Sequence, residues 1–142
     1  MKAYLSRRYH FSASHRLHTE SYDAAKNIAV FGKCNNPHGH GHNYTVQVTL
    51  SGQVDPATGM VCNLADLDAF AQTNVLARFD HTNLNKLDCF RDTVSTTENL
   101  SIEIHRIFQR FTAACLERVH VEETSNNSFD YSGGSAPALG AI

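Results

Sequence analysis

Residues 34–44 read CNNPHGHGHNY, and they place three histidines at alternate positions just before an alternating run of apolar residues. The run keeps the same parity as the histidines, since its apolar members are Tyr44, Val46, Val48 and Leu50. Side chains two residues apart on a β-strand lie on one face of the sheet. A strand from about residue 40 to 54 therefore carries His40 and His42 on its buried face, about 7 Å apart.

Two inward imidazoles point to a metal site. Neutral imidazole is the commonest metal ligand, and a catalytic zinc ion takes three protein ligands with one position left open. The third ligand must come from another element. Residues 3–15 are expected to form a strand in which His15 shares a face with Phe11 and Ala13. A lone histidine at a strand end is more often structural, but two neighbouring imidazoles make His15 the candidate third ligand.

An expression tag or a loosely metal-binding surface segment is the alternative explanation of a histidine-rich tract. This tract is internal, its histidines are spaced by glycine, and it leads directly into a strand pattern. Cys34 also stands six residues before His40. These features favour a built metal site.

Length and charge limit the classes of protein. The chain of 142 residues fits one domain, which we assign to residues 1–132, and the glycine-rich residues 133–142 are expected to form a flexible tail. A net charge of −2 without a basic stripe argues against a nucleic-acid partner. Residues 1–8 lack the apolar core of a signal peptide and no apolar run reaches membrane-spanning length, so we expect no membrane partner and a cytoplasmic protein. The four separated cysteines are expected to be reduced thiols.

The remaining periodicities predict an α+β domain with elements in the order ββααββ. Residues 17–36 carry no sustained period and read as a long functional loop. A short strand is expected at 60–62, a helix capped by Asn63 from 64 to about 77, and a second helix from the capping-box sequence of residues 95–98 to about residue 114. Strands at 116–124 and 129–132 follow the second helix.

Further side chains offer chemistry. Beside a divalent metal and imidazoles, the Cys34 thiolate is favoured and takes a proton from carbon; the alternative is an inert loop thiol. Asp80 and His81 form either a catalytic pair or a helix-end cation with its own carboxylate. Glu123 shares a face with Val119 and Val121, where a carboxylate needs a donor such as the paired N–H groups of a ligand.

Six motifs, in this order, resemble the 6-pyruvoyl-tetrahydropterin synthase family from about residue 5 to residue 132. They are FSASHRL at 11–17, GKCNNP at 32–37 with GHGHNY at 39–44, DPATGM at 55–60, DHTNL at 80–84, STTEN at 95–99, and ET at 123–124 with NN at 126–127.

The resemblance implies a tunnelling fold, in which each subunit gives a four-stranded antiparallel sheet and two helices. Three such subunits would close a twelve-stranded barrel, and two barrels would stack into a hexamer. It implies a zinc ion held by His15, His40 and His42. It also implies that Cys34 acts with Asp80 and His81 contributed across a subunit interface. Glu123 would anchor the pterin ring in a pocket that Thr96, Thr97 and Glu98 line. The implied reaction converts 7,8-dihydroneopterin triphosphate to 6-pyruvoyl-tetrahydropterin and triphosphate.

The histidine tract also fits a second register. The related 6-carboxytetrahydropterin synthases of queuosine biosynthesis typically place their cysteine four residues before the first histidine of H-G-H, and His38 satisfies that spacing from Cys34. Residues 35–37 and the position of Asn43 favour the pyruvoyl enzyme and the ligands His40 and His42. A carboxy synthase is the first alternative, and a non-catalytic pterin- or metal-binding protein is the second.

Overall fold

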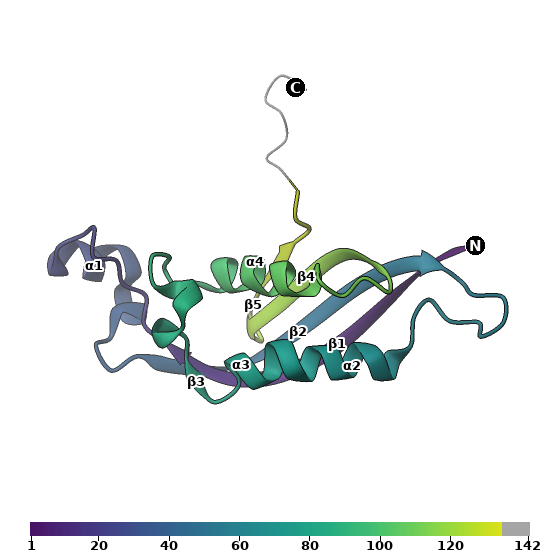
Figure 1. Ribbon diagram of the computed structural model, residues 1–142. Helices are drawn as coiled ribbons and strands as arrows, with labels where there is room; N and C mark the ends of the chain where they lie inside the picture. The colour runs from purple at the N-terminus through teal and green to yellow at the C-terminus, as the bar shows by residue number, and fades with distance from the viewer. Residues whose placement is uncertain (135–142) are drawn as a thin grey trace, which may run out of the picture.

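The computed structural model describes residues 1–134, which form one mixed sheet with helices packed against it (Figure 1). The strand order is β3-β1-β2-β4-β5. The strands are β1 (Lys2–His15), β2 (His40–Gln53), β3 (Thr82–Asn83), β4 (Cys115–Thr124) and β5 (Asn127–Tyr131). The two-residue β3 runs parallel to β1, whereas the other neighbouring strands are antiparallel. The predicted α+β class is confirmed, but the sheet has five strands rather than four because β3 pairs with the end of β1.

The long pairing of β1 with β2 positions the histidines. Its register runs without a shift from Lys2 opposite Gln53 to His15 opposite His40. The inward residues are buried from Tyr9 to His15 on β1 and from Tyr44 to Leu50 on β2, whereas the opposite face of the sheet carries polar side chains such as Ser6 and Thr45. The parity predicted from the sequence is therefore the parity of the folded strands.

Two helical segments cover the buried face of the sheet (Figure 1). The first comprises α2 (Leu64–Ala71), the π-helical turn η2 (Gln72–Leu76) and α3 (Ala77–Phe79). The second is α4 (Thr97–Phe108). Their apolar stripes meet the strands in one core, whose fully buried members include Val46, Val48, Leu67, Val75, Phe79, Leu100, Ile104, Phe108, Val119 and Val121. No helix within residues 1–134 is long and apolar enough to cross a membrane.

The stretch predicted as a featureless loop contains a helix. Helix α1 (Ala24–Phe31) and the 3-10 helix η1 (Gly32–Asn35) occupy most of residues 17–36. Asp23 caps α1 by accepting from the Lys26 N–H, and Gly32 ends it with a φ of 57°. The helix escaped prediction because it is short and largely exposed, with apolar side chains such as Ile28 and Val30 on the surface rather than in the core. Its cap residues were the available signal.

Other boundaries also differ from the predictions. Residues 60–62 form no strand, and α4 ends at Phe108 rather than near residue 114. The N-cap of α4 is Thr96, whose hydroxyl accepts from the Asn99 N–H, so the capping box does not begin at Ser95. Short 3-10 helices η3 (Leu84–Lys86) and η4 (Asp88–Phe90) lie between α3 and α4. Most of the predicted tail, residues 135–142, lies outside the described residues.

Asn27 offers a test of how the segment before η1 is held. Its fully buried side chain accepts from the Thr19 N–H and donates to the carbonyls of Thr19, Tyr22 and Asp23. We expect Asn27→Ala to destabilise this segment by about 2 kcal/mol, because buried main-chain groups lose their partners. Hydrogen exchange should show faster exchange of residues 19–31, with Lys26→Ala as the exposed control. Unchanged exchange in Asn27→Ala would contradict this account.

Candidate metal centre

His15, His40 and His42 converge at one end of the β1–β2 ladder. One ring nitrogen from each lies within 4.8 Å of the others. The ring centroids are 4.6 Å apart for His15 and His40, 5.1 Å for His15 and His42, and 4.8 Å for His40 and His42. Direct pairing places His15 opposite His40, and the two-residue period brings His42 to the same face. The structure therefore assembles the three residues that the sequence suggested as metal ligands.

The orientation of His15 leaves a ligand atom free. Its Nδ1 lies 2.6 Å from the main-chain oxygen of Ser95, so the ring donates its Nδ1–H there. The Nε2 atoms of His15 and His42 are buried without a hydrogen-bond partner. Metal-binding histidines commonly donate their second N–H to a carbonyl or carboxylate, which fixes the ring and its tautomer. Unpartnered buried nitrogens that face one another fit a zinc ion with three imidazole ligands.

Burial also favours the form of histidine that binds metal. It lowers the pKa of His15 despite the opposing hydrogen bond to Ser95, and it lowers the pKa of His42 despite the charge of Glu123. Burial thus favours the neutral form of both rings, which has a free nitrogen lone pair.

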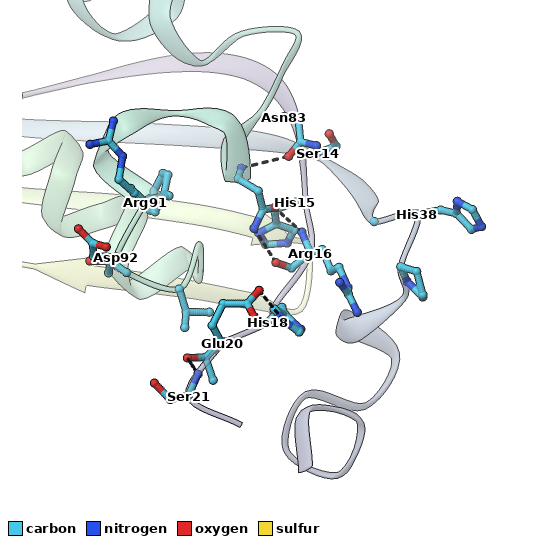
Figure 2. A pocket seen from close by; sticks show the side chains of 17 residues that line it. Ser14, His15, Arg16, His18, Glu20, Ser21, His38, Asn83, Arg91 and Asp92 are labelled. Carbon is cyan, nitrogen blue, oxygen red and sulfur yellow. Dashed lines mark hydrogen bonds and ion pairs between the residues drawn. The ribbon is translucent and has the colours of Figure 1, made fainter. Parts of the chain in front are cut away.

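His38, the alternative ligand, stands apart from the group. Figure 2 shows its side chain directed away from His15, at the edge of a hollow of about 520 Å³. His15 lies on the wall of this hollow, with Arg16 and His18 nearby. The geometry therefore supports His40 and His42 over His38 as partners of His15.

Glu123 lies beside the three histidines. Its Oε1 is 3.5 Å from Nε2 of His42, and its Oε2 accepts a hydrogen bond from the Thr97 hydroxyl. Thr97 is buried at the start of α4, and Glu123 comes from the end of β4. The donor that the sequence required for Glu123 is therefore present, and it is Thr97.

Thr96 and Glu98, the other two residues expected to line the pterin pocket, do not contact Glu123 as Thr97 does. Thr96 is half-buried, and its hydroxyl caps α4. Glu98 is exposed in the first turn of that helix. Residues 95–97 thus contribute the main-chain oxygen that holds His15, the helix cap and the donor to Glu123. A main-chain oxygen has no sequence signature, so the role of Ser95 was not predicted.

Cys34 lies in η1, which is held against the chain that follows β1. Its carbonyl accepts from the Leu17 N–H at 2.8 Å, and the Asn35 side chain donates to the Leu17 carbonyl at 2.8 Å. Arg16 completes the link by donating its Nε–H to the Asn35 carbonyl at 3.0 Å. Since His15 directly precedes these residues, the half-buried Cys34 is tied to the metal-ligand end of β1.

Asp80 and His81 follow the end of α3, and their side chains contact each other. Asp80 Oδ1 accepts from the Ser12 main-chain N–H at 2.9 Å and lies 3.0 Å from Nδ1 of His81. The hydrogen bond from Ser12 lowers the pKa of Asp80. His81 has a φ of 58°, a region that is strained for a residue with a side chain, and its imidazole is 83% exposed. Its main-chain N–H donates to the Ser12 carbonyl at 2.6 Å, which holds this conformation.

His81 and His42 border a second hollow, of about 410 Å³. Cys34 lines neither of the two hollows in the part of the chain that the structure describes. Within the described residues, the structure therefore brings together the histidine group, Glu123 and Thr97. It holds Cys34 and the Asp80–His81 pair in separate, well-anchored segments.

Comparison with known proteins identifies the family. The family model described as 6-pyruvoyl tetrahydropterin synthase matches residues 4–134. The chain belongs to the 6-pyruvoyl tetrahydropterin synthase family. It is 48% identical over 134 residues to the 6-pyruvoyl tetrahydrobiopterin synthase of Homo sapiens, a match that covers 93% of this chain and 92% of the human protein. The resemblance noted in the sequence is thus confirmed.

A solved structure and a more distant relative complete the comparison. The structure of 6-pyruvoyl tetrahydropterin synthase from Caenorhabditis elegans superposes with a TM-score of 0.90 at 43% identity, covering 94% of this chain and 97% of the other. An Archaeoglobus fulgidus protein provisionally named 6-carboxy-5,6,7,8-tetrahydropterin synthase is 36% identical over 108 residues, which are 75% of this chain and 84% of that protein. This protein is therefore a member of an enzyme family that acts on pterins.

Acidification should destabilise the metal-free protein. Burial lowers the folded-state pKa of His15, His42 and His105, while unfolded histidine has a pKa of about 6.5. The unfolded chain therefore binds more protons below about pH 6.5, and the free energy of unfolding falls as pH decreases. The loss is at most about 1.4 kcal/mol per pH unit for each such histidine.

Urea unfolding of the chelator-treated protein at pH 7.5 and pH 5.5 measures this effect. Carboxylates with a lowered pKa, such as Asp80, titrate below this window and do not contribute. His15→Gln should show a weaker dependence on pH than the unaltered chain. Equal stability at both pH values would show that burial of the histidines does not lower their pKa.

Proposed function

We propose that this protein is a zinc-dependent lyase that converts 7,8-dihydroneopterin triphosphate to 6-pyruvoyl-tetrahydropterin and triphosphate. The observation that carries the proposal is the convergence of His15, His40 and His42 beside Glu123, in a chain of the pyruvoyl synthase family. A site for a Lewis acid and a site for a pterin ring would then be adjacent.

The three histidines would hold zinc through their free ring nitrogens. When bound, zinc supplies Lewis-acid polarisation of the oxygens on the substrate side chain, which acidifies the neighbouring C–H bonds. The Ser95 carbonyl keeps His15 in the tautomer that this role requires. Three protein ligands leave one position for the substrate, as is typical of catalytic zinc sites.

Proton transfer is assigned to Cys34 and His81. The Cys34 thiolate would take a proton from the side-chain carbon and return it, and His81, oriented by Asp80, would act as the partner acid or base. Loss of triphosphate is a redox-neutral elimination, and the two-electron oxidation of the side chain balances the two-electron reduction of the ring, so no nicotinamide or flavin is required. The exposed, anchored position of His81 suits a group that serves a neighbouring subunit.

Glu123 would bind the pterin ring. A carboxylate accepts paired N–H groups in bidentate fashion, and its half-buried position strengthens such bonds. The exposed Glu98 and the half-buried Thr96 would border the same pocket from the start of α4.

The assembly is proposed to be a hexamer of two stacked trimeric barrels. β1 meets β3 over two residue pairs only, and β5 is the other outer strand of the sheet. Unpaired strand edges favour pairing with further copies, and closure into a barrel removes them. In such an assembly, Asp80 and His81 would reach the Cys34 of a neighbouring subunit. The cytoplasmic location stays a prediction from the sequence.

A 6-carboxytetrahydropterin synthase is the alternative, favoured by the spacing between Cys34 and His38 and by the Archaeoglobus fulgidus relative. Two observations weigh against it. His38 points away from His15, and the human relative, which is more similar over more of the chain, carries the pyruvoyl name. A non-catalytic pterin- or metal-binding protein is the remaining possibility.

Activity and product can be tested together. The zinc-loaded protein incubated anaerobically with 7,8-dihydroneopterin triphosphate should release triphosphate and leave a pterin with a three-carbon side chain by mass spectrometry. Cys34→Ala should slow turnover at least about 100-fold, because it lacks the proton-transfer group. Acetaldehyde with a carboxylated pterin would contradict the pyruvoyl assignment. A wild type as inert as Cys34→Ala would support a binding protein.

Mixing two inactive variants tests whether the catalytic residues meet across a subunit interface. Cys34→Ala and His81→Ala should each be inactive alone, and dissociating and reassembling them together should restore part of the activity if the two groups meet across an interface. Cys115→Ala, at an exposed cysteine on β4, is the matched thiol control and should remain active.

A further inference from the structure

Tyr44 is a buried tyrosine beside the candidate metal centre whose hydroxyl has no hydrogen-bond partner. The residue is 1% exposed, and its oxygen meets no donor or acceptor in suitable geometry. The ring is fixed by stacking on Phe11, with centroids 5.1 Å apart, and by an edge contact with His42 at 5.6 Å. A buried hydroxyl without a partner is uncommon and calls for an explanation.

Tyr44 and Glu123 are the next residues beyond the last pair of β2 with β4. In that pairing, Thr45 is opposite Glu122 and Val46 is opposite Val121. β4 has a bulge against β5 between Glu122 and Thr124, so Glu123 lies where the regular pairing ends. Burial raises the pKa of Tyr44, and the charge of Glu123 raises it further, as expected of two neighbouring groups.

Thr97 is the second hydroxyl in this group. It donates to Oε2 of Glu123, and its hydroxyl lies near that of Tyr44 and opposes the rise in the tyrosine's pKa, although the two hydroxyls do not meet in good hydrogen-bond geometry. Thr97 is 1% exposed, so it is better placed to hold Glu123 than to contact a ligand. The oxygen Oε1 of Glu123 lies on the side of His42, toward the metal centre.

We propose that Tyr44 and Thr97 are positioning residues that hold the Glu123 carboxylate from its buried side. A carboxylate has about four lone-pair positions. If the two hydroxyls occupy lone pairs on the buried side of the carboxylate, the remaining lone pairs are directed toward the ligand, in the plane in which paired N–H groups donate. This inference rests on the proposed function, in which Glu123 binds the pterin ring.

Single-atom variants test the inference with biopterin as the probe. Tyr44→Phe removes only the hydroxyl, and Thr97→Val removes the other donor while it keeps a branched side chain. Each should raise the Kd for biopterin, measured by fluorescence titration, by about tenfold, the effect of one lost hydrogen bond. Zinc content should remain at the wild-type level. In turnover assays KM should rise while kcat changes less than twofold, since ring binding is lost rather than chemistry.

A rescue variant and a double variant distinguish loss of a positioning hydrogen bond from a general packing defect. Thr97→Ser restores the hydroxyl and should restore the affinity of Thr97→Val. Tyr44→Phe combined with Thr97→Val should weaken binding less than the product of the two single effects, because both act through one carboxylate. Full restoration by Thr97→Ser would not be expected of a variant that fails merely through a packing defect.

Tyr9→Phe is the matched control. Tyr9 is also a buried tyrosine on the inner face, but its hydroxyl donates to Asp68 at 2.8 Å, on α2. Its loss should lower stability and leave the Kd for biopterin unchanged. The inference is overturned if Tyr44→Phe binds biopterin like the wild type, or if Tyr9→Phe weakens binding equally. A wild type that neither binds biopterin nor releases triphosphate would instead overturn the proposed function itself, and the inference with it.

Discussion

The antiparallel pairing of β1 with β2 is the constraint on which the site depends. Fourteen consecutive pairs run from Lys2 and Gln53 to His15 and His40 without a bulge. Because side chains alternate across a strand, a slip of one residue would move a whole set of inward side chains to the polar face. The apolar residues along the ladder therefore fix the register, and the register brings the imidazoles of His15, His40 and His42 together. The same strand register therefore forms both the hydrophobic core and the candidate metal centre.

The start of α4 supplies the second constraint. The Ser95 carbonyl orients His15, the Thr96 hydroxyl caps the helix, and the Thr97 hydroxyl holds Glu123. Asn99 adds a hydrogen bond from its side chain to the Val94 carbonyl at 2.9 Å, which ties the preceding residue to the same turn. One helical turn thus connects a metal ligand on β1 with a carboxylate on β4. A displacement of this turn would be expected to affect both.

The sequence was sufficient for features that follow from periodicity. The even-numbered parity of residues 40–50 predicted which histidines point inward, and the apolar stripe of α4 predicted its buried face. Features without periodicity were missed. Helix α1 is exposed, β3 has only two residues, and the carbonyl of Ser95 is a main-chain atom that every residue type has. The cap of α4 was misplaced by one residue because Ser95 and Thr96 are equally suitable cap residues. Contacts across a subunit interface cannot be read from the periodicity of one chain.

X-ray absorption at the zinc edge, on protein loaded with one equivalent of zinc, tests the central claim most directly. The account predicts three imidazole nitrogens at about 2.0–2.1 Å and one oxygen, without sulfur. His38→Ala should leave this spectrum and the zinc content unchanged, whereas His42→Ala should lose the metal and remain folded. A sulfur neighbour at about 2.3 Å would make Cys34 a ligand. Loss of zinc in His38→Ala with retention in His42→Ala would show that the site uses the other histidine register.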